Sequence, residues 1–366
     1  MPPKKKKEGK KKEEPLPGQL PEDFLNNYKK FCKLCMVPEC PQIIETLTDE
    51  EKLEVFNSSK QFVIHPVDPQ DENEPRLGPG GVRAITTTIL AKGKDVEGNF
   101  YMKPVDEKGF PIIYKQVKSL RIWWSNIGDD GCRSIAELLR LGGEDVQINY
   151  LELWDNNITA SGADAIGRSL QVGWNRSLLT LKLDYNRTLG SDGVMALCKG
   201  LRTNSSLKQL HVPFCAIDAR AGAPLAEMLT YAKLGLTLLN LQGNRLSGDG
   251  LLDLCIGLQS NKSLTDLNLA DNEIEGRHVE ALTKLAEVME LPATIGGNNL
   301  SKVNLLYNRI GVEGAQIFQP KLTPENKKIN TFLVDASLPE EIFTSIMRNN
   351  AGGGGKGKKG KKGKKK

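Results

Sequence analysis

Leucine and other apolar residues recur along much of the chain in the pattern L-x-x-L-x-L-x-x-N-x-L, where x is any residue. The fourth positions of successive copies lie between 28 and 36 residues apart. A pattern that returns at a nearly constant period predicts stacked structural repeats. The copies occupy residues 117–127, 148–158, 178–188, 207–217, 236–246, 264–274, 300–310 and, in a degraded form, 329–339.

Each copy combines two periods. The L-x-L core alternates in the way a half-buried strand does, and a segment of helical spacing follows it, such as SGADAIGRSLQ at 161–171. A Ser or Asp beside the first glycine of such a segment can cap a helix. A unit of this size cannot bury its apolar face alone, so neighbours must stack. We therefore predict a right-handed α/β solenoid, a horseshoe of about eight strand-helix repeats with a parallel inner sheet and outer helices.

The ninth position of the pattern is polar and small. After the strand the backbone turns inward, where its polar groups still need partners. A buried Asn offers two donors and one acceptor, so stacked Asn residues can bridge successive turns as a ladder. Cys can replace Asn as a small residue with a weak donor. The predicted ladder consists of Ser125, Asn156, Asn186, Cys215, Asn244, Asn272 and Asn308.

These features resemble the ribonuclease-inhibitor-like class of leucine-rich repeats. The resemblance rests on the spacing of 28–30 residues, the Asn or Cys at the ninth position, and the N-x-S-L sequences at 204–207 and 261–264. It covers about 117–347. An incomplete earlier copy is indicated by LGPGGVRAI at 77–85, which aligns with IGDDGCRSI at 127–135, although we expect its strand to be missing.

Changes in composition along the chain indicate how it is divided into parts. The predicted parts are a disordered Lys-rich tail at 1–19, an N-terminal helical cap at 20–76, a partial repeat with a hairpin insertion at 77–116, the leucine-rich repeat domain at 117–347, and a disordered Gly/Lys-rich tail at 348–366. The net charge of +5 is divided unevenly, because residues 1–14 carry +4, residues 351–366 carry +8 and the remainder carries −7. Blocks of like charge are typical of solvated tails that attract an acidic polymer, here tubulin tails or RNA, although they can also serve solubility alone.

Aromatic residues gather near the ends of the first predicted strands. In this register, positions 4 and 6 point into the core, and positions 5, 7 and 8 lie on or beside the concave face. An exposed aromatic cluster is a candidate protein-binding site. The alternative is that the 91–116 insertion or the N-terminal cap folds over the rings. We predict one aromatic patch, with further contacts from later repeats, made of Trp123, Trp124, Trp154, Asp155, Tyr185, Phe214 and Tyr307.

The sequence shows no catalytic or metal-binding constellation. Its three histidines stand in unrelated contexts without a nucleophile signature. The segment FCKLCMVPEC supplies three cysteines, Cys32, Cys35 and Cys40, whereas structural zinc requires four ligands. No apolar run reaches the roughly 20 residues of a membrane helix, and the chain begins without a secretory signal. We expect no cofactor, no metal, no membrane contact and no small-molecule substrate.

The combination of lysine-rich ends and a repeat body resembles proteins of the ciliary and flagellar axoneme. The resemblance implies a non-enzymatic protein-binding scaffold in the cytoplasm, attached to the microtubule cytoskeleton. Two alternatives remain. Ran GTPase-activating proteins are built from similar repeats, although they commonly end in an acidic tail and this chain ends in a basic one. The same basic ends would also suit an RNA- or ribonucleoprotein-associated protein.

Overall fold

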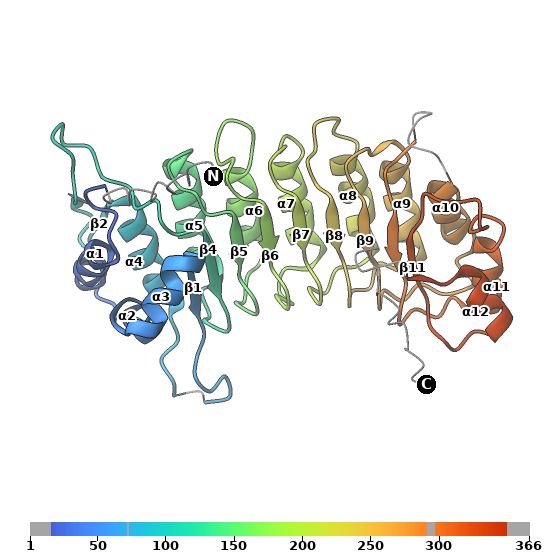
Figure 1. Cartoon of the computed structure of the whole chain (residues 1–366), viewed down its shortest axis with the longest axis horizontal. Helices are drawn as coiled ribbons and strands as arrows, with labels where there is room; N and C mark the ends of the chain where they lie inside the picture. The colour runs from blue at the N-terminus through green and yellow to red at the C-terminus, as the bar shows by residue number, and fades with distance from the viewer. Residues whose placement is uncertain (1–15, 72, 291–296, 350–366) are drawn as a thin grey trace, which may run out of the picture. The chain divides into compact units, whose positions relative to one another are not determined.

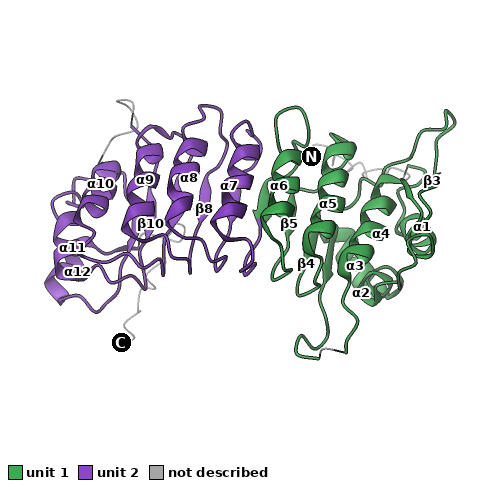
Figure 2. Cartoon of the chain, turned by 180° about the vertical axis from the view of Figure 1, so that it is seen from behind, with its two compact units in different colours: residues 1–181 green, residues 182–366 purple. Residues whose placement is uncertain are grey.

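The computed structural model describes residues 16–71, 73–290 and 297–349. These divide into two compact units, residues 1–181 and 182–366, which Figure 2 shows in different colours. Each unit is described by itself. The lysine-rich segments at 1–15 and 350–366 lie outside the described residues. No helix in the described ranges combines the length and the apolarity needed to cross a membrane.

Unit 1 begins with helices and continues with alternating strands and helices (Figure 1). Its elements are α1 (Pro21–Leu34), α2 (Pro41–Thr48), α3 (Glu50–Ser59), β1 (Gln61–Ile64), α4 (Gly78–Leu90), β2 (Lys92–Lys94), β3 (Phe100–Met102), β4 (Ser119–Ile122), α5 (Gly128–Gly142), β5 (Tyr150–Glu152) and α6 (Ala160–Ser169), with β6 (Thr180–Lys182) at the boundary between the units.

The first repeat is more complete than the sequence predicts. Strand β1 pairs in parallel with β4, so Phe62 lies opposite Leu120 and Ile64 opposite Ile122. Helix α4 follows β1 after a loop. The expectation that this copy lacks its strand is therefore wrong. Its apolar core is F-x-I in place of L-x-L, and a longer loop separates it from its helix, so the periodic pattern does not reveal it.

The N-terminal cap packs on β1 through aromatic rings. The Phe24 ring lies 5.3 Å from that of Phe62 and 4.9 Å from that of Tyr114. Gln19, which the sequence assigns to a disordered tail, is buried. Its Nε2 donates to the carbonyl of Ile113 at 2.9 Å, and its Oε1 accepts the N–H of Lys115 at 2.8 Å. Gln19 thus belongs to the folded cap, because it satisfies backbone groups that follow the insertion.

Unit 2 repeats the strand-helix alternation. Strands β7 to β11 pair in parallel in sequence order, and β12 pairs antiparallel with β11 at the end. Within each unit the helices lie on one side of the strands (Figures 1 and 2). The elements are α7 (Gly190–Leu201), β7 (Gln209–His211), η1 (Ala219–Ala221), α8 (Gly222–Leu229), β8 (Leu238–Asn240), α9 (Ser247–Ser260), β9 (Asp266–Asn268), α10 (Val279–Glu290), β10 (Lys302–Asn304), α11 (Gly311–Phe318), β11 (Thr331–Leu333), α12 (Glu340–Ile346) and β12 (Arg348–Asn349).

Strand β12 falls inside the segment that the sequence assigns to the C-terminal tail. Arg348 donates to the carbonyl oxygens of Thr323 at 2.6 Å, Asn326 at 2.7 Å and Ile329 at 2.8 Å. These bonds satisfy the carbonyls of the loop before β11. Arg348 and Asn349 therefore close the last parallel strand and do not belong to a tail.

The core follows the repeat pattern. The fourth-position residues are 0–1% exposed in every copy, from Leu120 to Phe332. Sixth-position residues such as Leu241 are buried beside them. The predicted α/β architecture, in which parallel strands alternate with helices as in a leucine-rich repeat solenoid, is confirmed.

The ninth-position side chains bond to the neighbouring repeats. Asn244 Oδ1 accepts the N–H of Cys215 at 3.0 Å and that of Ile217 at 3.1 Å, while its Nδ2 donates to the carbonyl of Val212 at 3.0 Å. The Cys215 thiol lies 3.1 Å from the carbonyl oxygen of Leu183, in the direction an amide donor would take. Bonds of the same kind, to a carbonyl and an N–H of the preceding copy, are made by Asn156, Asn272 and Asn308.

Candidate functional site

The residue at position 8 has a left-handed backbone in seven copies of the repeat, with φ between 46° and 68°. In five of these copies its N–H bonds to the position-7 carbonyl of the next copy, as Trp124 does to Trp154 at 3.0 Å and Phe214 to Gln242 at 2.9 Å. This conformation is unfavourable for non-glycine residues and persists where surrounding contacts impose it. The seven residues are Trp124, Asp155, Tyr185, Phe214, Gly243, Asp271 and Tyr307.

The strand face is the set of side chains at positions 3, 5 and 7, opposite the buried positions 4 and 6. In unit 1 the register places Ser119 between Gln61 and Tyr150 across three strands. One step along, Arg121 lies opposite Val63 and Glu152. The predicted face positions did not include position 3, although alternation along a strand requires positions 3 and 5 to share one face.

Two adjacent tryptophans of unit 1 contact different neighbouring rings. Trp123, at position 7, stacks on His65 with ring centroids 5.9 Å apart and an interplanar angle of 24°. Trp124, at position 8, meets Trp154 edge to face at 4.0 Å and 67°. All three indoles are partly buried. We call Trp123, Trp124 and Trp154 the tryptophan cluster. Asp155 follows Trp154 directly and is also partly buried.

A polar network lies beside the tryptophan cluster. The Arg121 guanidinium lies 4.7 Å from the centre of the Tyr150 ring, and its Nε is 3.8 Å from Glu152 Oε2. The Tyr150 hydroxyl donates to the same oxygen at 2.9 Å. Glu152 is 7% exposed, so its buried carboxylate is balanced by a cation and a hydrogen bond.

Unit 2 holds a second aromatic pair. The rings of Tyr185 and Phe214 stack at 4.6 Å and 22°. A Cβ at Gly243 would lie 2.1 Å from Phe214 Cε1, so the Phe214 ring packs against the Gly243 backbone. Tyr307 is 68% exposed. The first tryptophans thus belong to unit 1 and these rings to unit 2, and the expectation of one continuous patch stays a prediction.

Later strands of unit 2 carry amides on the strand face. Asn240 Nδ2 lies 3.5 Å from His211 Nδ1, and Asn240 Oδ1 accepts the backbone N–H of Gln242 at 3.0 Å. Asn268 Nδ2 donates to Gln242 Oε1 at 3.1 Å. The strand face between Phe214 and Tyr307 therefore includes these three amides.

The insertion does not reach the tryptophan cluster through any described contact. Strand β2 pairs with β3 as the predicted hairpin, and β2 contacts α4. The Tyr101 ring meets the Phe31 ring of α1 at 5.5 Å. His65, which directly follows β1, stacks on the Trp123 ring of the cluster. The sequence offered no signal for His65, because the copy that contains β1 does not show the L-x-x-L-x-L pattern.

A cavity of about 460 Å³ adjoins this stack in unit 1. It is lined by the loop after β1, by α2 and by Ser125, and His65 stands at its wall. Arg76 also lines it, with Nη2 bonded to the carbonyls of Pro69 at 2.8 Å and Asp71 at 3.1 Å. The lining is mostly apolar, as in many binding clefts.

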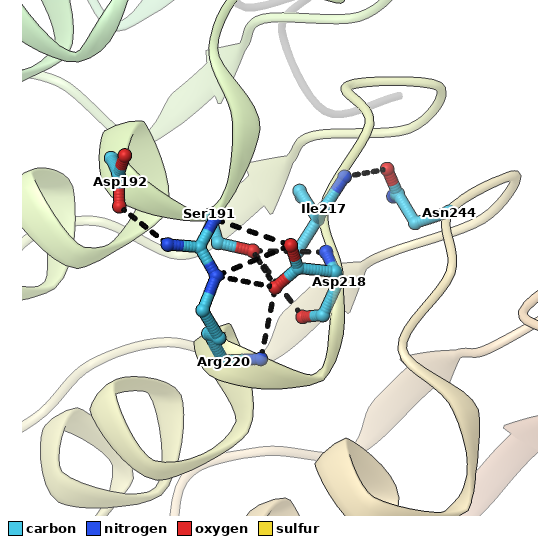
Figure 3. Close-up of polar contacts among 6 residues, drawn as sticks. All are labelled: Ser191, Asp192, Ile217, Asp218, Arg220 and Asn244. Atoms are coloured by element: carbon cyan, nitrogen blue, oxygen red, sulfur yellow. Dashed lines mark hydrogen bonds and ion pairs between the residues drawn. The ribbon is translucent and has the colours of Figure 1, made fainter.

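A charged loop cluster lies where the strand of one copy leads into its helix (Figure 3). Ser191 Oγ donates to Asp218 Oδ1 at 2.7 Å, and Arg220 Nε donates to the same oxygen at 3.1 Å. The bonds from Arg220 hold the pKa of the Asp218 carboxyl below its ordinary value. Arg220 also reaches Asp192 at 3.2 Å. Its guanidinium is therefore held by one carboxylate of its own loop, Asp218, and by one from helix α7 of the preceding copy, Asp192.

The cysteines are suited to packing. Burial raises the pKa of the Cys32 thiol to about 11, and that of Cys198 to about 12. Thiols with such pKa values stay protonated near neutral pH, whereas metal ligands and nucleophiles are thiolates. Within the described ranges no group of three His, Cys, Asp or Glu side chains is placed to hold a metal ion.

Known proteins share these repeats. A family model described as "Leucine Rich repeat" matches residues 175–198 and 260–282. Ribonuclease inhibitor from Sus scrofa is 30% identical over 248 residues, covering 65% of this chain and 51% of the inhibitor. The chain carries leucine-rich repeats similar to those of ribonuclease inhibitor. It spans about half the length of that relative.

Other matches are partial. NACHT, LRR and PYD domains-containing protein 5 from Homo sapiens is 30% identical over 169 residues, which is 46% of this leucine-rich repeat chain and 14% of that protein. Among solved structures, leiomodin-1 actin-binding site 2 has a TM-score of 0.33 at 14% identity, covering 51% of this chain and 84% of that one. A match at this level says nothing of function.

Proposed function

We propose that this leucine-rich repeat protein is a non-enzymatic scaffold that binds a protein partner through the strand face of its early repeats. The observation that carries the proposal is the tryptophan cluster, in which Trp124 and Trp154 meet at 4.0 Å while remaining partly exposed. Large aromatic side chains contribute much of the free energy at protein interfaces because they bury area at small entropic cost.

The surroundings of the cluster favour a protein over a bare nucleic acid. Arg121, Glu152 and Asp155 supply both signs of charge next to the rings. A rim of mixed charge around aromatic anchors is typical of protein interfaces, whereas nucleic-acid sites are mainly positive. The pig relative is named as an inhibitor of ribonuclease, which is itself a protein.

We further propose that the partner complex lies on microtubules of the cilium or flagellum. The support is the charge distribution of the sequence, with lysine-rich ends around a body of net charge −7. Tubulin tails are acidic, so lysine segments would attach to them by an electrostatic attraction that salt screens. This part of the proposal rests on sequence alone, since those ends lie outside the described residues.

Proximity labelling in ciliated cells tests partner binding. Trp154→Ala removes a ring of the cluster, and Trp174→Ala is the matched control, because Trp174 is 43% exposed in a loop and stacks with Arg140. We expect Trp154→Ala to lose a set of labelled proteins that the wild type and Trp174→Ala retain. Identical labelling by all three proteins would contradict the proposal.

Co-sedimentation tests microtubule attachment. The full chain should pellet with intact microtubules at low salt and be released at high salt. Binding should fall when residues 351–366 are deleted or when the tubulin tails are removed by limited proteolysis. Equal pelleting with tail-stripped microtubules would overturn the electrostatic attachment, and RNA crosslinking that depends on residues 351–366 would favour the ribonucleoprotein alternative.

A further inference from the structure

Strand β4 presents three successive strand-face side chains whose polar atoms lack hydrogen bonds. Ser119 Oγ, Arg121 Nε and Trp123 Nε1 are each buried, and none has a hydrogen-bond partner among the described residues. Buried polar groups are nearly always hydrogen-bonded in folded proteins. Three such donors in a row on one face form a place where a binding partner could supply acceptors.

The neighbouring side chains do not supply the missing acceptors. Ser119 is 8% exposed, and the register places it between Gln61 and Tyr150. The Tyr150 hydroxyl is already bonded to Glu152. Arg121 Nε lies 3.8 Å from Glu152 Oε2, which is an ion-pair distance and longer than a hydrogen bond.

Trp123 has a ring neighbour but no acceptor. His65 stacks face to face on its indole, and the His65 Nδ1 lies 2.8 Å from the carbonyl oxygen of Pro66. His65 is exposed, so this ring can move aside when a partner approaches. An acceptor that reaches Trp123 Nε1 would then add a hydrogen bond to the aromatic contact.

The spacing of the three groups defines the shape of what would bind them. Alternate residues of a strand lie about 6.6 Å apart, and the same interval separates alternate side chains of any extended peptide. An extended segment laid along β4 would therefore place one side chain near each of Ser119, Arg121 and Trp123. A helix repeats its faces at a different interval and would match only one of them.

The charges favour carboxylates in that segment. Arg121 is the cation at the centre of the row, and Lys60 and Lys118 stand just before β1 and β4, near the Ser119 end. Of the opposing carboxylates, Glu152 is already engaged by Arg121 and Tyr150. Asp155 lies at the other end, beside Trp154.

We propose that the partner contacts β4 through an extended acidic segment with Asp or Glu at alternate positions, whose oxygens accept from Ser119, Arg121 and Trp123. This inference rests on the proposed protein-binding function and names the chemistry of the partner at that site. Hydrogen bonds to charged groups are stronger than neutral ones, so the Arg121 contact should dominate.

Nuclear magnetic resonance of the full chain with ¹⁵N-labelled tryptophan tests this directly. The probe is the peptide acetyl-Glu-Val-Glu-Val-Glu-amide. Its controls are acetyl-Val-Val-Glu-Glu-Glu-amide, with the same composition in the wrong spacing, and acetyl-Lys-Val-Lys-Val-Lys-amide. The Trp123 indole signal is identified by its loss in Trp123→Phe, and the Trp174 indole serves as an internal reference.

We expect the alternating glutamate peptide to move the Trp123 indole proton downfield and to leave Trp174 unchanged. Arg121→Met should weaken binding of the peptide by about tenfold, because a charged hydrogen bond is lost. Ser119→Ala should weaken it by about threefold, because a neutral hydrogen bond is lost. An unmoved Trp123 signal, or equal shifts with either control peptide, would overturn the inference.

The outcome separates this inference from the proposed function. Loss of cellular partners in Trp154→Ala together with a Trp123 signal that ignores all three peptides would leave the scaffold function standing and reject the acidic segment. Retention of all partners in Trp154→Ala would reject the proposed function whatever the peptides do.

Discussion

Asn244 Oδ1 accepts the backbone N–H of Cys215 at 3.0 Å, which joins two successive repeats of unit 2 through one amide side chain. The same oxygen accepts the backbone N–H of Ile217. The Nδ2 of Asn244 donates to the carbonyl of Val212 and, at 2.7 Å, to the carbonyl of Leu241. With the carbonyl of Gln242, which also accepts from Nδ2 at 3.2 Å, five backbone groups of two copies bond to a single residue that is 4% exposed. The role of the ninth position as a ladder is a prediction that this geometry makes testable.

Asn244→Ala should destabilise unit 2 strongly. Removing the amide leaves buried backbone donors and acceptors without partners, at about 1–3 kcal/mol for each group left unsatisfied. Chemical denaturation measures the loss, which we expect to be about 3 kcal/mol. Asn157→Ala is the control, because Asn157 is exposed and donates only to Asn126 at 2.9 Å. Equal stability of the two variants would show that the ladder is dispensable.

Leu239→Ala tests the core. Leu239 is 0% exposed at the fourth position of its strand, and truncating such a residue costs about 2–5 kcal/mol in lost burial and cavity formation. Leu179→Ala provides the comparison, since Leu179 is 41% exposed. We expect a change of less than about 0.5 kcal/mol there, as for surface positions in general. A similar loss in both variants would contradict the assigned register.

Gly243→Ala should displace the Phe214 ring without altering Phe214 itself. The added Cβ would lie 2.1 Å from Phe214 Cε1, at a backbone φ of 68°. Gly311→Ala has a φ of 60° and no atom within 4 Å of the new Cβ, so it isolates backbone strain from the clash. We expect near-ultraviolet circular dichroism of the Tyr185–Phe214 pair to change only in Gly243→Ala. Matching spectra in both variants would mean that the ring does not rest on Gly243.

Lys328 should make stability depend on pH in the alkaline range. Burial lowers the pKa of its ammonium group from 10.5 to about 8. The unfolded chain therefore holds this proton more tightly than the folded one between about pH 8 and 10.5, and stability attributable to Lys328 rises with pH across that window. Melting temperatures of wild type and Lys328→Met measured side by side should converge as the pH rises. Curves that stay parallel would show that the Lys328 pKa is not lowered by folding.

The repeat pattern predicted the strand cores well, because a buried Leu such as Leu239 obeys the simple alternation of a strand. It could not predict β1, whose core is Phe62 and Ile64 in a single copy with a long loop behind it. Nor did it find His65, which contacts Trp123 only through tertiary folding.

The backbone conformation at position 8 could not be predicted from the sequence for another reason. Trp124 and Tyr185 carry side chains that disfavour a positive φ, so residue type gave no signal of it. The conformation is set by a backbone bond to the next copy, as between Trp124 and Trp154. Expectations based on side-chain preferences fail where a neighbouring repeat dictates the backbone.

That backbone bond has a consequence for how such a protein can change. Since the turn at position 8 is fixed by main-chain atoms, the side chain there contributes little to folding, and the row accepts Trp, Asp, Tyr and Phe with the same φ. Gly243 is the exception, because the Phe214 ring occupies its space. Apart from the stacked pair of Tyr185 and Phe214, the row offers variable sites on a constant frame, so mutation can exchange one partner for another while the stability of the solenoid is preserved.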